Sequence, residues 1–258
     1  MDTVDKKILF YLLKDGRTPQ RQIAKALGIS AQTLNYRMSK MIDDQIIEGF
    51  QVRVSPRIYG KIEGYAAFIS EDQIEKDYIS KLKCLEKITL YGIEGGNKEE
   101  INQKIENFAK KLGEPVMRYI PIIENYSGNS KDVDLQIIEQ MRKMPRAKIV
   151  EIAKAIDQPV IRVKRRYNYL TRNNLIAVLA KVDLSKTDIV LFSIFSNNQE
   201  VLQPILSEIS IFQIVDQKSG VFVCYADNMV NARNVINAVR EKEKNSDVMV
   251  IYDYEFLN

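Results

Sequence analysis

Histidine does not occur among the 258 residues of this chain. Because imidazole is the commonest general acid or base and the commonest transition-metal ligand, its absence excludes a hydrolytic triad of the usual kind and a histidine-based metal site. Catalysis by a carboxylate, a lysine or a tyrosine is not excluded, but the absence of histidine makes an enzyme the less favoured class of protein. We therefore expect a protein that is not an enzyme and that has no cofactor.

Cysteine is also scarce, with Cys84 and Cys224 far apart and each inside an apolar stretch. No pair has metal or redox spacing, so we expect two small buried side chains. No apolar run approaches the roughly 18 residues of a membrane helix. The N-terminus is polar and acidic where a secretion signal would be basic and then apolar, which predicts a cytoplasmic protein with no membrane partner.

The chain repeats itself at half its length. A shift of 129 residues aligns residues 5–47 with 134–176 without a gap, and ten of the 43 aligned pairs are identical. Apolar positions also agree, as in Leu12 and Met141. We interpret this as a tandem duplication. Residues 125–130 have loop composition, lie where the copies meet, and are the candidate linker.

Each copy begins with three short helices. In the first copy, apolar spacing predicts helices over residues 4–13, 20–27 and 31–44. Gly28 turns the chain after the second helix, and Ser30 caps the third. Two short helices joined by such a turn, after a packing helix, form a helix-turn-helix. Residues 46–54 alternate around a glycine and predict a wing hairpin.

Each copy continues into a small α/β domain. In the second copy the pattern predicts the ferredoxin-like order β-α-β-β-α-β over residues 189–195, 199–209, 211–216, 221–226, 230–242 and 247–254. In the first copy it predicts strands over 65–70, 88–93 and 116–123 and helices over 76–85 and 98–112. The first copy is therefore expected to be truncated, with one strand missing or very short.

The predicted fold class is α+β, with tandem winged helix-turn-helix domains each followed by a ferredoxin-like domain. The expected winged helix-turn-helix domains cover residues 1–60 and 131–185. The expected sensing or dimerisation domains cover residues 61–126, in truncated form, and 186–258.

The residues of the first motif resemble the Lrp/AsnC family of prokaryotic regulators. The opening helix with Asp5, Ile8 and Leu9, and the stretch 22–30 followed by Leu34, Arg37, Met41 and 45–47, carry this resemblance. The β-α-β-β-α-β domain resembles the ligand-sensing and oligomerising domain of the same family. The family usually has one copy per chain and pairs as dimers, so two copies in one chain are a departure from it.

The resemblance implies a transcriptional regulator whose partner is double-stranded DNA. It also implies an effector such as an amino acid and self-association through the sensing domains. The tandem form favours an archaeal source.

A helix-turn-helix reads DNA with the N-terminal part of its last helix in the major groove. The outward positions expected there are Gln32, Thr33, Tyr36, Arg37 and Lys40, matched in the second copy by Ile161, Arg162, Arg165, Arg166 and Tyr169. Lys164 and, in the wing, Arg53 complete the candidate set. Glutamine suits adenine, and arginine suits guanine or phosphate. A tyrosine at this place closes the core against the wing equally well.

Charge favours the second motif. Residues 146–172 hold eight basic and two acidic side chains, whereas residues 17–45 hold five and two. Such local excess over a net charge of only +4 is typical of a phosphate-contacting surface. The two copies differ at most outward positions, so we hypothesise that they read unlike half-sites, as a pseudo-dimer, or that one mainly anchors on phosphates.

Several alternatives remain open. The arginines of residues 162–166 are also compatible with a solvated helix face. A non-specific architectural DNA binder would carry the same charge, and a winged helix can serve as a protein-interaction module. An enzyme of the same fold, such as a tetrapyrrole decarboxylase, is disfavoured because such enzymes are expected to use histidine.

Overall fold

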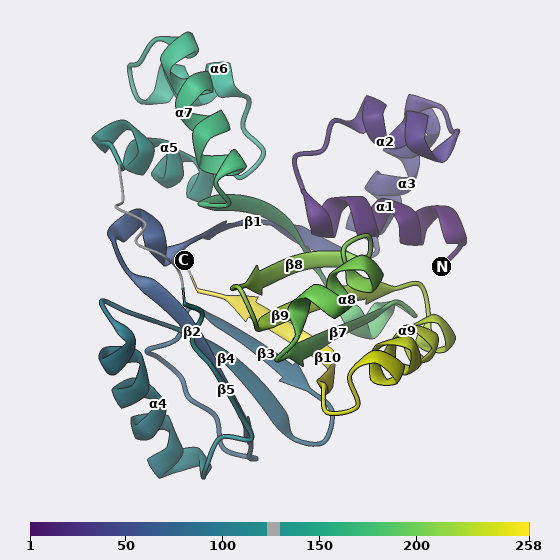
Figure 1. Ribbon diagram of the computed structural model, residues 1–258. Helices are drawn as coiled ribbons and strands as arrows, with labels where there is room; N and C mark the ends of the chain where they lie inside the picture. The colour runs from purple at the N-terminus through teal and green to yellow at the C-terminus, as the bar shows by residue number, and fades with distance from the viewer. Residues whose placement is uncertain (123–129, 258) are drawn as a thin grey trace. The chain divides into compact units, whose positions relative to one another are not determined.

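The computed structural model describes residues 1–122 and 130–257, which form two compact units (Figure 1). The helix-turn-helix unit comprises Tyr11–Lys61 and the described residues of Tyr126–Val182. The sheet unit comprises Met1–Phe10, the described residues of Ile62–Asn125, and Asp183–Leu257. Each unit therefore draws on both copies of the repeat. Apart from Ser130, the candidate linker lies outside the described residues.

Three helices open each copy, as the apolar spacing predicts. In the first copy they are α1 (Thr3–Lys14), α2 (Gln20–Leu27) and α3 (Ala31–Asp43). In the second copy they are α5 (Asp132–Lys143), α6 (Ile149–Ala155) and α7 (Val160–Arg172). The expected signals between α2 and α3 are confirmed. Gly28 adopts a left-handed φ of 65° after α2, and Ser30 Oγ accepts a hydrogen bond from the Thr33 amide at 3.0 Å.

The strands that follow these helices pair with each other, so the predicted wing hairpin is wrong. Strand β1 (Ile47–Val54) of the first copy runs antiparallel to β6 (Ile176–Val182) of the second. Gly49 makes no turn; it lies at a break in register, with a φ of 155° that other residues rarely adopt. The extended pattern of residues 46–54 is confirmed as a strand, but the partner of this strand lies in the other copy.

The register of this ribbon relates the two copies by an approximate two-fold axis. Phe50 pairs with Ala180, and Gln51 pairs with Leu179. In the repeat register Ala180 corresponds to Gln51 and Leu179 to Phe50. Equivalent strands thus meet at equivalent residues, as they do across the interface of a symmetric dimer.

The core of the second helix-turn-helix is completed from the first copy. Buried residues of all three of its helices, such as Ile137, Ile152 and Val163, cluster with Val52 of β1 and Ile58. Ile58 belongs to a short 3-10 helix, η1 (Pro56–Tyr59). Burial of apolar side chains is the dominant favourable contribution to folding, so the ribbon is part of the core of this motif.

The sheet unit contains one eight-stranded antiparallel sheet in the order β5-β2-β4-β3-β10-β7-β9-β8. The strands of the first copy are β2 (Ile62–Ile69), β3 (Ser80–Cys84), β4 (Ile88–Gly95) and β5 (Met117–Tyr119). Those of the second are β7 (Val190–Ser196), β8 (Ser210–Val215), β9 (Gly220–Ala226) and β10 (Asp247–Phe256). Each copy has the strand order of a ferredoxin-like sheet, so this part of the fold class is confirmed.

The helices of the sheet unit cover the strands of their own copy (Figure 1). Helix α4 (Lys98–Leu112) packs on β2 and β4, while α8 (Gln199–Leu206) and α9 (Met229–Lys242) pack on strands β7 and β9. The short 3-10 helix η2 (Leu184–Lys186) precedes β7. The six elements predicted for the second domain are confirmed.

In the first ferredoxin-like domain, the prediction of a helix over residues 76–85 is wrong. The expectation that this domain lacks a strand is also wrong. Residues 80–84 form strand β3 between β4 and β10, so the element lost is the first helix. Tyr78, Leu82 and Leu85 have helical spacing, but Ser80, Leu82 and Cys84 also fit a strand's period of two. Pairing with β10 of the other copy selects the strand over the helix.

Charged pairs hold the seam between the two halves of the sheet. Lys81 and Lys83 of β3 lie opposite Glu255 and Asp253 of β10. Lys83 Nζ is 2.8 Å from Asp253 Oδ2, and Lys81 Nζ is 3.8 Å from Glu255 Oε1. Because cross-strand pairs of opposite charge stabilise a sheet, these lysines favour the strand over a helix.

The first turns of α1 attach to the domain of the second copy. The Lys6 carbonyl accepts a hydrogen bond of 2.8 Å from Tyr225 Oη, and the Phe10 and Tyr225 rings lie 5.2 Å apart. Lys6 also pairs with Asp188, which holds the pKa of that carboxyl below its usual value. These first turns of α1 therefore pack within the sheet unit, and the helix continues along the chain into Tyr11–Lys61.

Both cysteines are buried, as expected, and burial raises the pKa of each thiol to about 12. A thiol with such a pKa is almost entirely protonated near neutral pH and is a poor nucleophile. Within residues 1–122 and 130–257, no helix is long and apolar enough to span a membrane.

The pairing of β1 with β6 predicts a specific cross-link. Arg53 and Ala177 face each other across the ribbon, whereas Val178 faces Val52. Directly opposed strand residues lie within disulfide range. Arg53→Cys/Ala177→Cys is expected to oxidise and lose two reactive thiols in a thiol titration of the native protein. Arg53→Cys/Val178→Cys is the matched control, because its two side chains point to opposite faces. Equal oxidation of both variants would contradict the register.

Candidate nucleic-acid interface

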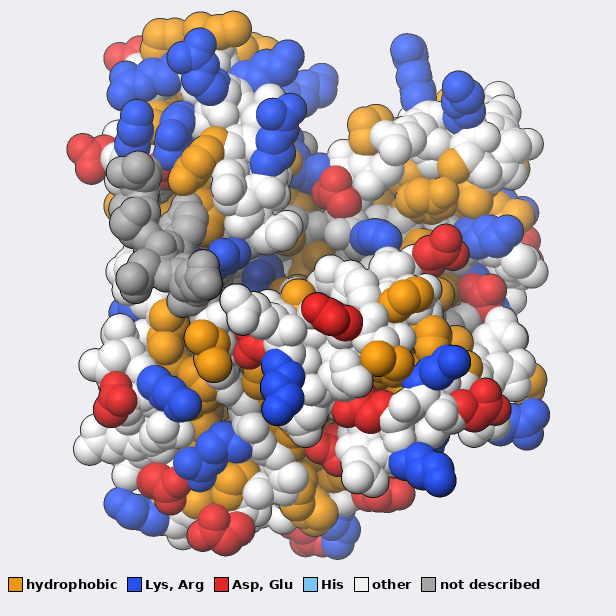
Figure 2. All heavy atoms as spheres, in the orientation of Figure 1, with side chains coloured by type: hydrophobic (Ala, Val, Ile, Leu, Met, Phe, Trp, Pro, Cys, Tyr) orange, Lys and Arg blue, Asp and Glu red, His pale blue; other side chains and the backbone are white. Residues whose placement is uncertain are grey.

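Helix α7 presents basic side chains from its N-terminal half. Arg162, Lys164 and Arg165 are exposed, and Ile161 beside them is 72% exposed. Figure 2 shows lysine and arginine side chains gathered over α5–α7 on the face in view. Their positions on the last helix of the motif are those from which a helix-turn-helix contacts DNA.

Helix α3 presents a different chemistry at the equivalent positions. Gln32, Thr33, Tyr36 and Lys40 are all exposed, and Tyr36 is 69% exposed. The Thr33 hydroxyl lies 2.8 Å from Ser30 Oγ, so its polar end takes part in the cap and its methyl group is left for contact. The Tyr36 side chain points to solvent and does not close the core.

Arg166 does not face outward as the sequence predicts. Its Nε lies 2.7 Å from Asp134 Oδ1 and its Nη2 lies 2.5 Å from Oδ2, a two-point ion pair. Asp134 on α5 is fully buried, and the Arg166 side chain is only 14% exposed. Arg166 therefore joins α7 to α5. The reason lies 32 residues away in the chain, where Asp134 needs a cation to compensate its buried charge.

The same carboxylate completes the start of α5, because Asp134 Oδ2 accepts a hydrogen bond of 2.8 Å from the Lys131 amide. The first copy has Asp5 and Arg37 at the equivalent positions, and Arg37 is half-buried. The positional identity of this acid and base in both copies was the signal that could have marked them as an ion pair.

Two further candidates lie on the structural side of the motif. Tyr169 is half-buried, packs on the core cluster of the second motif, and has its ring 4.3 Å from Arg166 Cζ. It closes the core, in contrast to Tyr36. Arg53 lies half-buried on β1, opposite Ala177.

A second pair of equivalent arginines joins the two copies. Arg17 Nη1 donates to the Pro145 carbonyl at 2.9 Å, and its Cζ lies 5.1 Å from the Tyr167 ring. Arg146 Cζ lies 4.5 Å from the Phe50 ring, and burial together with Arg17 lowers the pKa of Arg146. Part of the basic excess in the sequence therefore serves folding. The exposed cations of α7 are among those that remain for a ligand.

The geometry is that of a protein with two helix-turn-helix motifs in one chain, whose following strands β1 and β6 pair with each other. A family model described as "Winged helix-turn-helix DNA-binding" matches residues 1–48. An uncharacterized HTH-type transcriptional regulator of Pyrococcus furiosus is 27% identical over 150 residues, which cover 58% of this chain and 99% of that protein. It matches little more than one of the two copies.

Other relatives match the helix-turn-helix region only. The HTH-type transcriptional regulator LrpA of Pyrococcus horikoshii is 43% identical over 60 residues, 23% of this chain and 43% of that protein. Regulatory protein AsnC of Haemophilus influenzae is 42% identical over 60 residues, 23% of this chain and 40% of that protein. The chain thus aligns with less than half the length of these two. The resemblance to the Lrp/AsnC family is confirmed.

Two crystal structures of one protein, the siroheme decarboxylase NirDL, align with almost the whole chain. One of them aligns over 98% of this chain and 92% of its own, at 11% identity and a TM-score of 0.48. A likeness at this level carries no conclusion about activity. Among the described residues, no group of three or more carboxylates and cysteines is placed to hold a metal ion.

The buried pair predicts a large loss of stability on removal of its acid. Asp134→Asn leaves the Arg166 charge poorly compensated and is expected to cost about 3 kcal/mol in the free energy of unfolding. Asp132→Asn, an exposed neighbour on the same helix, is the control and is expected to cost less than about 0.5 kcal/mol. Urea unfolding of both variants measures the difference. A similar loss in the two would show that the ion pair does not stabilise the motif.

Proposed function

We propose that the chain is a transcriptional regulator that binds double-stranded DNA. Its two helix-turn-helix motifs form a pseudo-dimer and contact DNA with different side chains. The observation that carries this proposal is the set of exposed cations on α7, with Arg162, Lys164 and Arg165 on the helix that would enter the major groove. The names of the relatives, HTH-type transcriptional regulators, support it.

The two motifs contact DNA in different ways. The second contacts phosphates or guanines through arginine, because guanidinium groups match both. The first reads base edges through Gln32 and the methyl group of Thr33, which suit adenine and thymine. The shared ribbon of β1 and β6 supports this division, because it pairs the two motifs while leaving the outward positions of α3 and α7 to diverge.

Regulation is proposed on the family resemblance. A small-molecule effector such as an amino acid would act through the ferredoxin-like domains, and two chains would associate through the same domains. The contact of Tyr225 with Lys6 supports this route, because Lys6 lies in α1, whose later turns continue along the chain into the first helix-turn-helix. The site of action proposed is the cytoplasm.

DNA binding is tested over a salt series with the chain's own promoter region and with random DNA of equal length. The promoter is expected to bind about 10³-fold more tightly, the low end for specific readers. Arg162→Ala/Arg165→Ala is expected to weaken binding and to lower the slope of log K against log salt by about 1 to 2, because each lost phosphate contact removes about 0.9.

The matched control removes two charges from elsewhere in the chain. Arg240→Ala/Lys242→Ala takes two exposed cations from the last turn of α9 and is expected to leave affinity and slope unchanged. Equal, salt-steep binding to both DNAs would replace the regulator by a non-specific architectural protein. Equal loss in the two double variants would remove α7 from the interface.

A further inference from the structure

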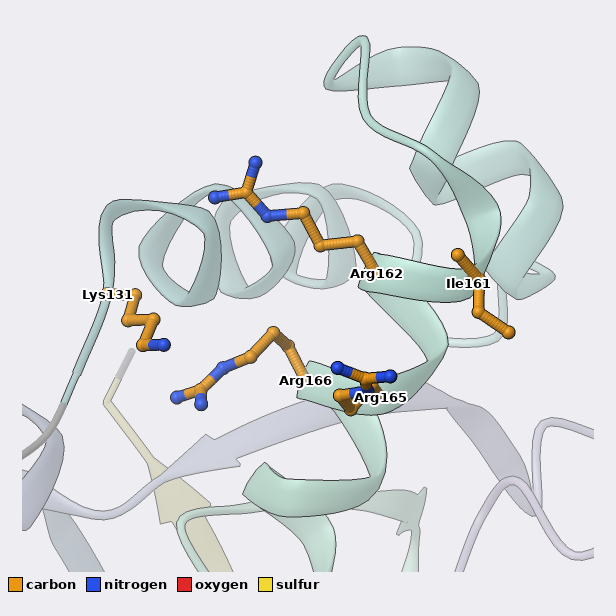
Figure 3. A pocket seen from close by; sticks show the side chains of 5 residues that line it. All are labelled: Lys131, Ile161, Arg162, Arg165 and Arg166. Carbon is orange, nitrogen blue, oxygen red and sulfur yellow. The ribbon is translucent and has the colours of Figure 1, made fainter.

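A cavity of about 320 Å³ lies against α7 in the second helix-turn-helix (Figure 3). Its lining residues are Lys131, Ile161, Arg162, Arg165 and Arg166. Lys131 precedes α5, and the other four belong to α7, so two elements form the walls. Four of the five side chains carry a positive charge at the end of an aliphatic stem, so the lining offers counter-charges to an anion and apolar contact to a carbon skeleton.

Three of these four charges are uncompensated within the part of the chain that the structure describes. Arg166 is paired with Asp134 at the base of the cavity. Lys131, Arg162 and Arg165 have no carboxylate within ion-pair distance among the described residues, and Arg162 Nη1 donates only to the neutral Gln158 Oε1, at 2.7 Å. Cations gathered around one space repel each other, and a multiply charged anion relieves that repulsion.

The first motif has the residue types of the base of this site but not those of its walls. The residues equivalent to Asp134 and Arg166 are Asp5 and Arg37. The residues equivalent to Lys131, Ile161, Arg162 and Arg165 are Asp2, Gln32, Thr33 and Tyr36. One cation is therefore replaced by an acid and two by neutral side chains. The helix-turn-helix motif can therefore fold without this cluster of cations. We attribute the cluster to a ligand that only the second motif binds.

We propose that this cavity binds the phosphate group of a free organic phosphate. A phosphate monoester carries between one and two negative charges near neutral pH and accepts two-point hydrogen bonds from guanidinium groups, whereas a carboxylate brings a single charge. The volume exceeds that of a phosphate group alone, and Ile161 gives apolar contact to the carbon skeleton beside it.

The consequence for regulation rests on the proposed function. Arg162 and Arg165 line the cavity and also belong to the helix that would contact DNA. The same guanidinium groups cannot serve a bound organic phosphate and a backbone phosphate at once. A free phosphate ester therefore competes with DNA at the second motif and leaves the first motif unaffected.

Calorimetric titration of the full chain, without DNA, tests the site itself. Phenyl phosphate is the probe, with inorganic phosphate and benzoate for comparison at equal ionic strength. Phenyl phosphate is expected to bind at one saturable site and more tightly than either. Arg165→Ala is expected to weaken it by about tenfold or more, the value of one lost charged hydrogen bond.

Lys164→Ala is the matched control, since Lys164 is an exposed cation on the same helix that does not line the cavity. It is expected to change the affinity by less than about twofold, because an exposed charge acts weakly at a distance. Absence of saturable binding to the wild type, or equal losses in the two variants, would overturn the site. If Arg165→Ala impairs DNA binding while no free phosphate binds, the cavity holds only backbone phosphate and the proposal is wrong.

A second titration, with DNA, tests the competition. Phenyl phosphate is expected to weaken DNA binding by the wild type more than sodium chloride of the same ionic strength does, and to have no such extra effect on Arg165→Ala. An equal effect of the two salts would overturn the competition. Failure of DNA binding altogether would reject the proposed function and would leave the result of the DNA-free titration standing.

Discussion

The structure depends on strand pairing between the two copies of the repeat. Strand β1 has its partner in β6, and β3 at the edge of the first ferredoxin-like sheet pairs with β10 of the second. An extended strand with unpaired amide and carbonyl groups is unstable alone, so each copy supplies what the other lacks. Fusion into one chain makes this pairing intramolecular and independent of protein concentration.

The same constraint explains where the copies have diverged. The ribbon of β1 and β6 and the ion pair of Asp134 with Arg166 hold helices in place. The acid and the arginine of this pair occur at equivalent positions in both copies. The outward faces of α3 and α7 do not hold other elements in place. Gln32, Thr33 and Tyr36 stand where the second copy has Ile161, Arg162 and Arg165. A single chain is free to keep one scaffold and two different surfaces, which a symmetric dimer of identical chains is not.

Local chemistry was predictable from the sequence, and contacts between distant segments were not. The helices of both motifs and the six elements of the second domain follow from apolar spacing and caps within a few residues. The predictions of a helix over residues 76–85 and of a wing hairpin over residues 46–54 were wrong because the strands formed there pair with the other copy. The prediction that Arg166 faces outward was wrong because only the fold brings Asp134 to it. The cavity beside α7 could not be foreseen, because it forms between α7 and the residue before α5.

The two helix-turn-helix motifs share one duplicated scaffold, and we propose that they contact DNA with unlike chemistry. Selection of binding sites by the full chain from a library of randomised duplexes is the test. We expect an enriched sequence without two-fold symmetry, in which one part has defined bases and the other tolerates substitution. Enrichment of a palindrome, which two identical motifs would select, would show that the two motifs do not differ in this way.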